Sequence, residues 1–263
     1  MYSNEGIVKV ILTHDVDWSI HGPGKEHILA RRDRFSDEVI LKVIREGYNP
    51  YFNIPELMDL EDFCGVRSTF FFRCMYDDGS TIESYGRILK ELIDGEWEIG
   101  VHINNSSTLE SMILEKKTIE DIVGIKVYGS RVHNLDIEFE NLPLLYKAGF
   151  KYDSSITFNK YDIDIRNTGC LIMNGLIVFP ITIMDTYLFT YMRVSEDKII
   201  NVVNRALDFA FKKGYMTILW HDCSLKMKGG RIYPKILEFL VSKDNVEIVR
   251  GIDAYRFVKG DLK

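Results

Sequence analysis

Short apolar runs alternate along the chain with longer stretches of helical periodicity. The apolar runs are rich in β-branched and aromatic residues, which is typical of strands. They lie at residues 8–13, 67–72, 97–101, 126–130, 176–181, 215–220 and 246–249. Most are apolar throughout rather than at every second position, which indicates a parallel sheet covered by helices.

The stretches between these runs predict helices that lead into the next strand. Apolar residues recur three or four positions apart in residues 85–94, 142–149 and 195–214, and each stretch ends at or beside a glycine. This βα alternation predicts an α/β fold, and a chain of 263 residues is long enough to close the sheet into a (β/α) barrel. We expect a single domain over residues 1–263, with a helical insertion around residues 25–64 between the first two strands.

Composition narrows the class of protein. The chain is 46% hydrophobic and 27% charged, and its net charge of −6 comes without a long basic run. A nucleic-acid partner is therefore not expected. No apolar run approaches the length of a membrane span, and the first residues do not resemble a signal peptide, so we predict a cytoplasmic protein. The four cysteines have no metal-binding spacing and are expected to be reduced thiols.

Polar residues that bind metals or transfer protons follow four of the predicted strands. These are His14, Asp15 and Asp17 after the first run, His102 after the third, Arg131 and His133 after the fourth, and His221 and Asp222 after the sixth. In a parallel barrel the carboxyl ends of the strands meet on one face, where barrel active sites lie. Each cluster alone is more typical of a turn or a structural hydrogen bond, but their convergence predicts a shared site. Asp15 and Asp17 should face one side, whereas His14 should point away.

The motifs and their order resemble those of the polysaccharide deacetylases with a NodB-homology domain. LTHDVD at residues 12–17 is similar to the first motif of that family and EIGVH at 98–102 to the second. GSRVHNL at 129–135 resembles the arginine-containing third, and KAGFKYDSS at 147–155 and ILWHD at 218–222 resemble the fourth region and the last motif. The resemblance spans about residues 7–250 and implies a distorted (β/α) barrel. It also implies metal-dependent removal of an acyl group, usually acetyl, from an amino sugar.

The resemblance further implies roles for individual residues. Asp15 is the expected catalytic base, His221 the catalytic acid, and Asp17 and His102 are expected to bind a divalent metal, with zinc as the first choice. Arg131 should hold Asp15 ionised, because an adjacent cation favours a carboxylate. The metal would lower the pKa of a bound water and polarise the acyl carbonyl. The sequence does not decide the roles of Asp153 and Asp185. Each either orients Arg131 or His221 or caps a turn.

One position departs from the family pattern. Typical members carry a second metal-binding histidine four residues after the first, and here that position is Ser106. A hydroxyl is a poor zinc ligand, so another donor is needed, and His133 is the best candidate. The alternatives are a ligand from Asn104, Asn105 or Asp222, or a degraded metal site.

Three functions are consistent with the sequence. The first is a metal-dependent hydrolase that removes an acyl group from an amino sugar, an oligosaccharide or a related small amide. The second is a carbohydrate-binding protein that has lost catalysis on the same fold, which Ser106 motivates. The third is a ring-opening cyclic amidase of the allantoinase type. Metal analysis of the purified protein separates the first function from the second.

Overall fold

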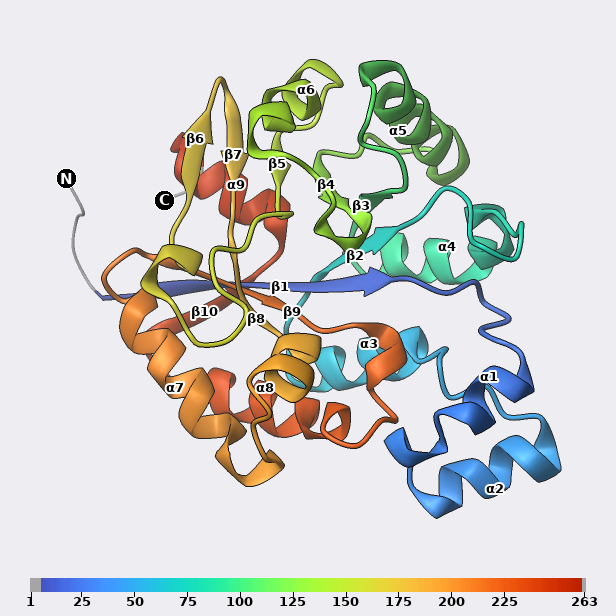
Figure 1. Ribbon diagram of the computed structural model, residues 1–263. Coiled ribbons are helices and arrows are strands. Elements are labelled where there is room, and N and C mark those ends of the chain that lie inside the picture. Colours follow the sequence, from blue (N-terminus) through green and yellow to red (C-terminus); the bar gives the residue numbers. More distant parts are fainter. Residues whose placement is uncertain (1–5, 262–263) are drawn as a thin grey trace.

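A computed structural model of the protein describes residues 6–261, in which a curled sheet is surrounded by helices (Figure 1). Within this range the strands are β1 Val8–Val16, β2 Thr69–Phe72, β3 Glu98–Ile103, β4 Gly129–Val132, β5 Tyr152–Asp153, β6 Leu171–Met173, β7 Leu176–Val178, β8 Ile181–Met184, β9 Tyr215–Leu219 and β10 Val246–Val249. The α-helices are α1 Lys25–Ala30, α2 Asp37–Glu46, α3 Ile54–Phe63, α4 Gly86–Asp94, α5 Leu109–Val123, α6 Leu142–Lys147, α7 Ile199–Ala210, α8 Tyr233–Val241 and α9 Gly251–Lys259.

Strand β1 forms the centre of the sheet and pairs in parallel with three other strands. Its carboxyl-terminal half pairs with β2, its amino-terminal half pairs with β10, and β9 lies along its other edge. From β2 the parallel ladders continue through β3 and β4 to β5, and then to β7, while β6 adds an antiparallel hairpin strand beside β7. The carboxyl ends of β1, β3, β4 and β9 therefore point the same way.

The sheet closes on itself through one bent segment. Strand β7 pairs with β5, and β8, which begins only two residues later, pairs with β9. Phe179 and Pro180 occupy the bend, and proline suits a point where the strand changes neighbours because it cannot donate a ladder hydrogen bond. The ring runs from β1 through β5 and the β7–β8 segment to β9 and back to β1. This ring is the distorted (β/α) barrel that the sequence predicts.

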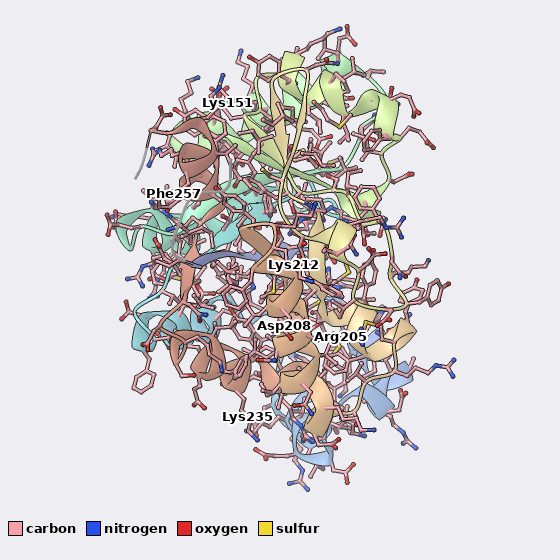
Figure 2. The ribbon with its side chains drawn as sticks, turned by 90° about the vertical axis from the view of Figure 1, so that its left-hand side faces the viewer. Lys151, Arg205, Asp208, Lys212, Lys235 and Phe257 are labelled. Atoms are coloured by element: carbon pink, nitrogen blue, oxygen red, sulfur yellow. The ribbon has the colours of Figure 1, made fainter. Side chains whose placement is uncertain are left out.

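The helices around the sheet have one face buried and the opposite face exposed to solvent, as α7 illustrates. In α7, Val203, Ala206 and Ala210 are buried against the sheet, and burying a side chain of valine size contributes about 1.5–3 kcal/mol. The charged residues Arg205 and Asp208 lie on the outer side of the same helix and Lys212 lies in the turn that follows it, where Figure 2 labels all three. Within residues 6–261, no helix has both the length and the hydrophobicity required to cross a membrane.

Three helices lie between β1 and β2, in the segment where the sequence predicts an insertion. The 3₁₀ turn Arg32–Arg34 joins α1 to α2, and α3 follows before the chain enters β2. Ser36 caps α2, because its hydroxyl accepts a hydrogen bond from the Val39 N–H at 3.3 Å. In Figure 1, α1 and α2 extend from the carboxyl end of β1. The insertion thus adds walls beside the end of the barrel that carries the polar clusters.

Several strand bounds differ from the predicted ones: β1 continues to Val16 and β3 to Ile103, so that His14, Asp15 and His102 lie within strands, and two further differences concern β4 and the run at 176–181. Strand β4 begins at Gly129 rather than at residue 126, because the Val127 N–H donates to the Glu120 side chain of α5 at 2.9 Å. The predicted strand over residues 176–181 is two strands, β7 and β8, separated by the bend at Pro180. The difference at β4 matters for the site, because it places His133 immediately after β4.

Candidate functional site

Asp15 and Arg131 form a buried ion pair at the carboxyl ends of β1 and β4. The Arg131 Nη1 group donates to Asp15 Oδ1 at 2.8 Å. The same guanidinium also donates to Thr13 Oγ1 at 2.9 Å, to the Ser154 carbonyl at 2.7 Å and to Ser154 Oγ at 2.8 Å. A buried ion pair is tolerated when its remaining polar groups are also bonded, and this arginine meets that condition. The free Asp15 oxygen, Oδ2, lies 3.8 Å from His102 Nε2.

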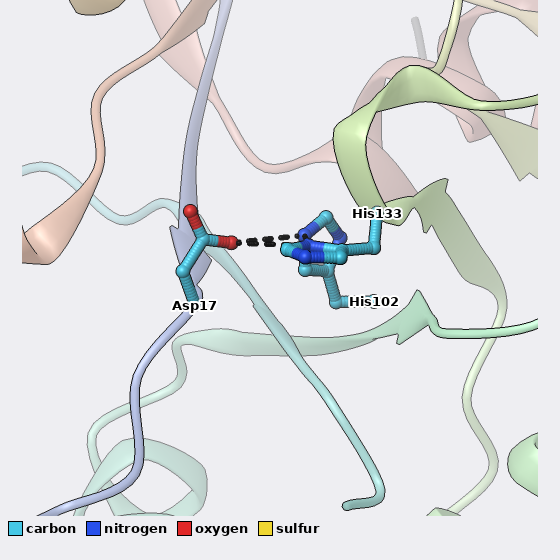
Figure 3. A group of neighbouring side chains, drawn as sticks. All are labelled: Asp17, His102 and His133. Atoms are coloured by element: carbon cyan, nitrogen blue, oxygen red, sulfur yellow. Dashed lines mark hydrogen bonds and ion pairs between the residues drawn. The ribbon is translucent and has the colours of Figure 1, made fainter. Parts of the chain in front are cut away.

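Asp17, His102 and His133 form a tight triangle beside this pair (Figure 3). Asp17 Oδ1 lies 3.1 Å from His102 Nε2 and 3.5 Å from His133 Nδ1, and the two ring nitrogens are 3.1 Å apart. Asp17 comes directly after β1, His102 lies in β3, and His133 comes directly after β4. Three strands that are distant in the sequence therefore bring their ligand atoms to one point.

The spacing of this triangle fits a divalent ion. Tetrahedral zinc with bonds of about 2.0–2.1 Å needs ligand atoms about 3.3 Å apart, and the three observed distances bracket that value. His102 Nδ1 donates to the Arg131 carbonyl at 3.0 Å, so Nε2 is the ring atom that faces the centre of the triangle. Burial raises the pKa of Asp17, but hydrogen bonds from His102 and His133 outweigh it and lower the pKa well below the usual range.

The loop after β4 holds His133 in place. Asn134 and Leu135 both have φ of 57°, which is uncommon outside glycine and costs of order 1–3 kcal/mol for each residue. Ser106 Oγ donates to the Asp136 carbonyl at 2.7 Å and so binds this loop to the segment after β3. The serine at the family's second-histidine position therefore supports the loop that carries His133.

The alternative ligands make other contacts. Asn104 accepts a hydrogen bond from Arg73 Nε at 2.6 Å and donates to the Met75 carbonyl at 2.7 Å, and Asn105 accepts from Ser107. Asp222 is buried, and burial together with the negative charge of Asp17 raises its pKa well above the usual range. None of these three belongs to the ligand-like group found within residues 6–261.

His221 lies on the other side of Asp17 and is oriented by Asp185. Its Nδ1–H donates to Asp185 Oδ1 at 2.7 Å, its backbone N–H donates to Asp185 Oδ2 at 2.9 Å, and its Nε2 lies 3.6 Å from Asp17 Oδ2. Burial lowers the pKa of His221, but the charge and the hydrogen bond of Asp185 outweigh burial and raise the pKa to about 10. His221 Nε2 thus faces Asp17 from a ring whose surroundings favour the protonated form.

The sequence leaves the role of Asp185 open, although one signal points to it. Asp185 follows the predicted strand at 176–181 as a polar residue after an apolar run, like the other site residues. Asp153 has a different environment: it binds Ser130 Oγ and Ser155, makes no direct bond to Arg131 or His221 among the described residues, and its pKa is raised to about 6 by burial.

His14 points away from the cleft, as predicted. Its Nδ1–H donates to the Trp220 carbonyl at 2.6 Å, and its Nε2 lies 2.7 Å from Glu61 Oε1. This histidine therefore joins β1 to the segment after β9 and to α3, outside the group of ligand atoms.

The cleft around Asp17 has several branches. A cavity of about 550 Å³ runs from Asp17 and His221 toward the helical insertion. A second cavity of about 320 Å³ lies beside Asp15 and His102 and is lined by Leu135, Met184 and Tyr187. These volumes are in the range of small-molecule sites.

Comparison with known proteins identifies the fold. No protein-family model and no curated protein matches the sequence. A structure from Mycobacterium smegmatis assigned as a polysaccharide deacetylase is 17% identical, with a TM-score of 0.69 over 99% of this chain and 93% of that chain. An allantoinase is 13% identical, with a TM-score of 0.67 over 97% and 91%. A pseudoenzyme of carbohydrate esterase family 4 from Bacillus anthracis is 12% identical, with a TM-score of 0.55 over 95% and 66%.

These identities are low enough that the likeness concerns the fold and leaves the activity open. The similar structures include enzymes, a pseudoenzyme and a mutant of that pseudoenzyme with restored activity. The same barrel is therefore compatible with more than one function. The chain has the fold of the polysaccharide deacetylases, as its motifs predict.

Proposed function

We propose that this protein is a metal-dependent amide hydrolase that removes an acyl group, acetyl being the first choice, from an amino sugar or a related small amide. The observation that carries the proposal is the triangle of Asp17 Oδ1, His102 Nε2 and His133 Nδ1, with sides of 3.1, 3.1 and 3.5 Å. Asp15 lies 3.8 Å from the His102 ligand atom and His221 lies 3.6 Å from the second oxygen of Asp17. Zinc bound by these three residues would supply an activated water and would polarise the acyl carbonyl.

Asp15 is placed to act as the base. Its Oδ1 is held by Arg131, whereas its Oδ2 is free and faces the triangle at 3.8 Å from His102 Nε2. In the proposed reaction Asp15 Oδ2 takes a proton from water as the water oxygen attacks the acyl carbon. Arg131 keeps the carboxylate in position, because its other donors bind Thr13 and Ser154.

His221 is placed to act as the acid. When the C–N bond breaks, the amine nitrogen needs a proton, and His221 Nε2 can donate one and become neutral while Asp185 holds the ring through its Nδ1–H. The products are a carboxylic acid and a free amine. Asp17 joins the triangle to His221. Its Oδ1 faces the histidine ligands His102 and His133, and its Oδ2 faces His221.

The apolar part of the cleft suits an acyl group. Leu135, Met184 and Tyr187 line the branch that also contains Asp15 and His102. A methyl group placed against Leu135 and Met184 would lie beside Asp15 and His102 in this branch, whose other walls are polar. This feature supports a short acyl chain at the amide.

Zinc binding and acetate release test the proposal. Purified protein should bind about one zinc ion per chain and release acetate from N-acetylglucosamine or its oligomers. His21→Ala is the control for loss of a histidine, because His21 is exposed and lies outside the triangle. A protein that binds no divalent metal and gains no thermal stability from one would refute the proposal and favour a carbohydrate-binding function.

A cyclic amidase remains the second candidate, because the allantoinase has nearly the same TM-score as the polysaccharide deacetylase, 0.67 against 0.69. Both reactions cleave a C–N bond next to a carbonyl, so the same acid and base serve either one. Assaying allantoin beside N-acetylglucosamine distinguishes them. If the protein hydrolyses allantoin and not N-acetylglucosamine, the cyclic amidase becomes the proposed function.

A further inference from the structure

The largest cavity described above connects the candidate catalytic residues to a group of basic side chains. At one end it is lined by Asp17, Asp185 and His221. At the other end it is lined by Arg31 and Arg34 from the helical insertion and by Lys228 from the segment before α8. A protein with a net charge of −6 thus places three cations on one wall of its cleft.

The two arginines have unused hydrogen-bonding capacity. Within residues 6–261 neither guanidinium forms an ion pair, and the recorded side-chain bond of Arg31 goes to the His27 carbonyl of its own helix at 3.4 Å. Lys228 Nζ donates to the Asp33 carbonyl at 2.9 Å, and its backbone N–H donates to the Arg34 carbonyl at 2.6 Å, which holds this lysine beside the turn. The carboxylates that line the cavity, Asp17 and Asp185, lie at its other end and already contact histidines.

Aromatic rings form the wall between the two ends. Trp18 lies edge-on to His27 with ring centroids 4.9 Å apart, and edge-on to Tyr51 at 5.4 Å. The pKa of His27 is lowered by burial and by the charges of Arg31 and Arg34, which agrees with both arginines facing this wall. Aromatic faces are common partners of sugar rings because they are broad, rigid and apolar.

We propose that the substrate is an acylated amino sugar that carries a phosphate group, and that Arg31, Arg34 and Lys228 bind this phosphate while the sugar lies against Trp18. The proposal rests on the proposed function, because it places the acyl amide at the Asp17 end of the same cavity. Phosphate is favoured over carboxylate because it offers three terminal oxygens and up to two negative charges to three cationic groups. The cavity of about 550 Å³ has room for a sugar and its phosphate.

Calorimetric titration with three sugars tests this subsite without relying on catalysis. The probes are N-acetylglucosamine, N-acetylglucosamine 6-phosphate, whose phosphate lies across the ring from the acetamido group, and N-acetylglucosaminuronic acid, which carries a carboxylate at the same position. A chelator is present throughout, so that no metal ion contributes to phosphate binding. We expect the phosphorylated sugar to bind at least about tenfold more tightly than the neutral sugar, with a difference that shrinks as salt rises.

The matched variants are Arg31→Gln combined with Arg34→Gln, and Arg32→Gln alone. Arg32 lies in the same turn and is exposed, but it does not line the cavity. The double variant should lose the preference for phosphate and Arg32→Gln should retain it. Thermal unfolding curves should be unchanged, because Arg34 is exposed and Arg31 half-exposed.

Three titration results would overturn the proposal: equal binding of neutral and phosphorylated sugars, a preference that survives the double variant, or equally tight binding of the carboxylate probe. Acetate release with added zinc is measured separately. A phosphate preference without acetate release would support the subsite while refuting the hydrolase. Acetate release at the same kcat/KM from neutral and phosphorylated sugars would refute the subsite while supporting the hydrolase.

Discussion

Replacing His133 with alanine removes one of the three candidate ligand atoms and leaves Asp17 and His102. Four-ligand structural zinc sites have binding free energies of about 10–16 kcal/mol, or about 2.5–4 kcal/mol per ligand. Because the sides of this triangle, 3.1, 3.1 and 3.5 Å, suit zinc with little rearrangement, His133 should contribute a full share. His133→Ala should therefore weaken zinc binding by about two to three powers of ten.

Competition of the protein with a chromophoric zinc chelator measures this effect. His102→Ala should match His133→Ala, whereas the control His21→Ala should bind zinc like the wild type. Adding S106H to H133A should restore binding only in part, because Ser106 contacts the Asp136 carbonyl at 2.7 Å rather than the triangle. A His133→Ala protein that binds zinc within about threefold of the wild type would refute the three-ligand site and leave His133 as a packing residue.

The remaining predictions concern the base, the acid and a buried carboxyl. Asp15→Asn should lower kcat by about 10²- to 10⁴-fold while zinc affinity changes little, whereas Asp17→Asn should lose both; equal and small effects would refute the assigned roles. Asp185→Asn should lower kcat by about 10- to 100-fold without a loss of zinc, because it leaves His221 without its orienting carboxylate; wild-type kcat would contradict this. Burial raises the pKa of Glu98 to about 7, above the pKa of the unfolded chain. The folded protein therefore favours the protonated carboxyl group. This stabilisation is fully present below about pH 4 and is lost as the pH rises through 7. The free energy of unfolding should fall by up to about 3 kcal/mol from about pH 5 to about pH 8, and by less in Glu98→Gln, as chemical denaturation measures; equal slopes would contradict this.

The sequence predicts the end of the barrel that carries the polar residues because parallel strands impose a common direction. Asp15, His102, Arg131 and His221 each follow or end an apolar run, so one rule brings them to one face. The roles assigned to them stay predictions until they are measured. The sequence does not say which strands are neighbours. The structure supplies this information, because β1 pairs with β2 on one edge and with β9 on the other.

Other features depend on tertiary contacts that leave no local pattern. Asp185 reaches His221 because β8 and β9 are neighbours, with Met184 opposite Leu219, although 36 positions separate the two residues. Ser106 departs from the family pattern in the sequence, but its bond to the loop after β4 appears only in three dimensions. Arg31 and Arg34 look like surface charges of an insertion until the fold turns that insertion toward the cleft.

The alternation of β1 explains why the acid and the base keep a fixed separation. Thr13 and Asp15 face the barrel interior, where Arg131 binds both, whereas His14 between them faces α3 and donates to the Trp220 carbonyl. The Trp220 N–H in turn donates to the Thr13 carbonyl at 3.0 Å, so two hydrogen bonds join β1 to the residue before His221. The β1–β9 ladder and these two bonds thus fix the position of Trp220 next to β1, and the Asp185 carboxylate fixes the His221 ring that follows it. The proposed base therefore lies within a strand and the proposed acid two residues after one, and groups held in this way need little reordering at each turnover.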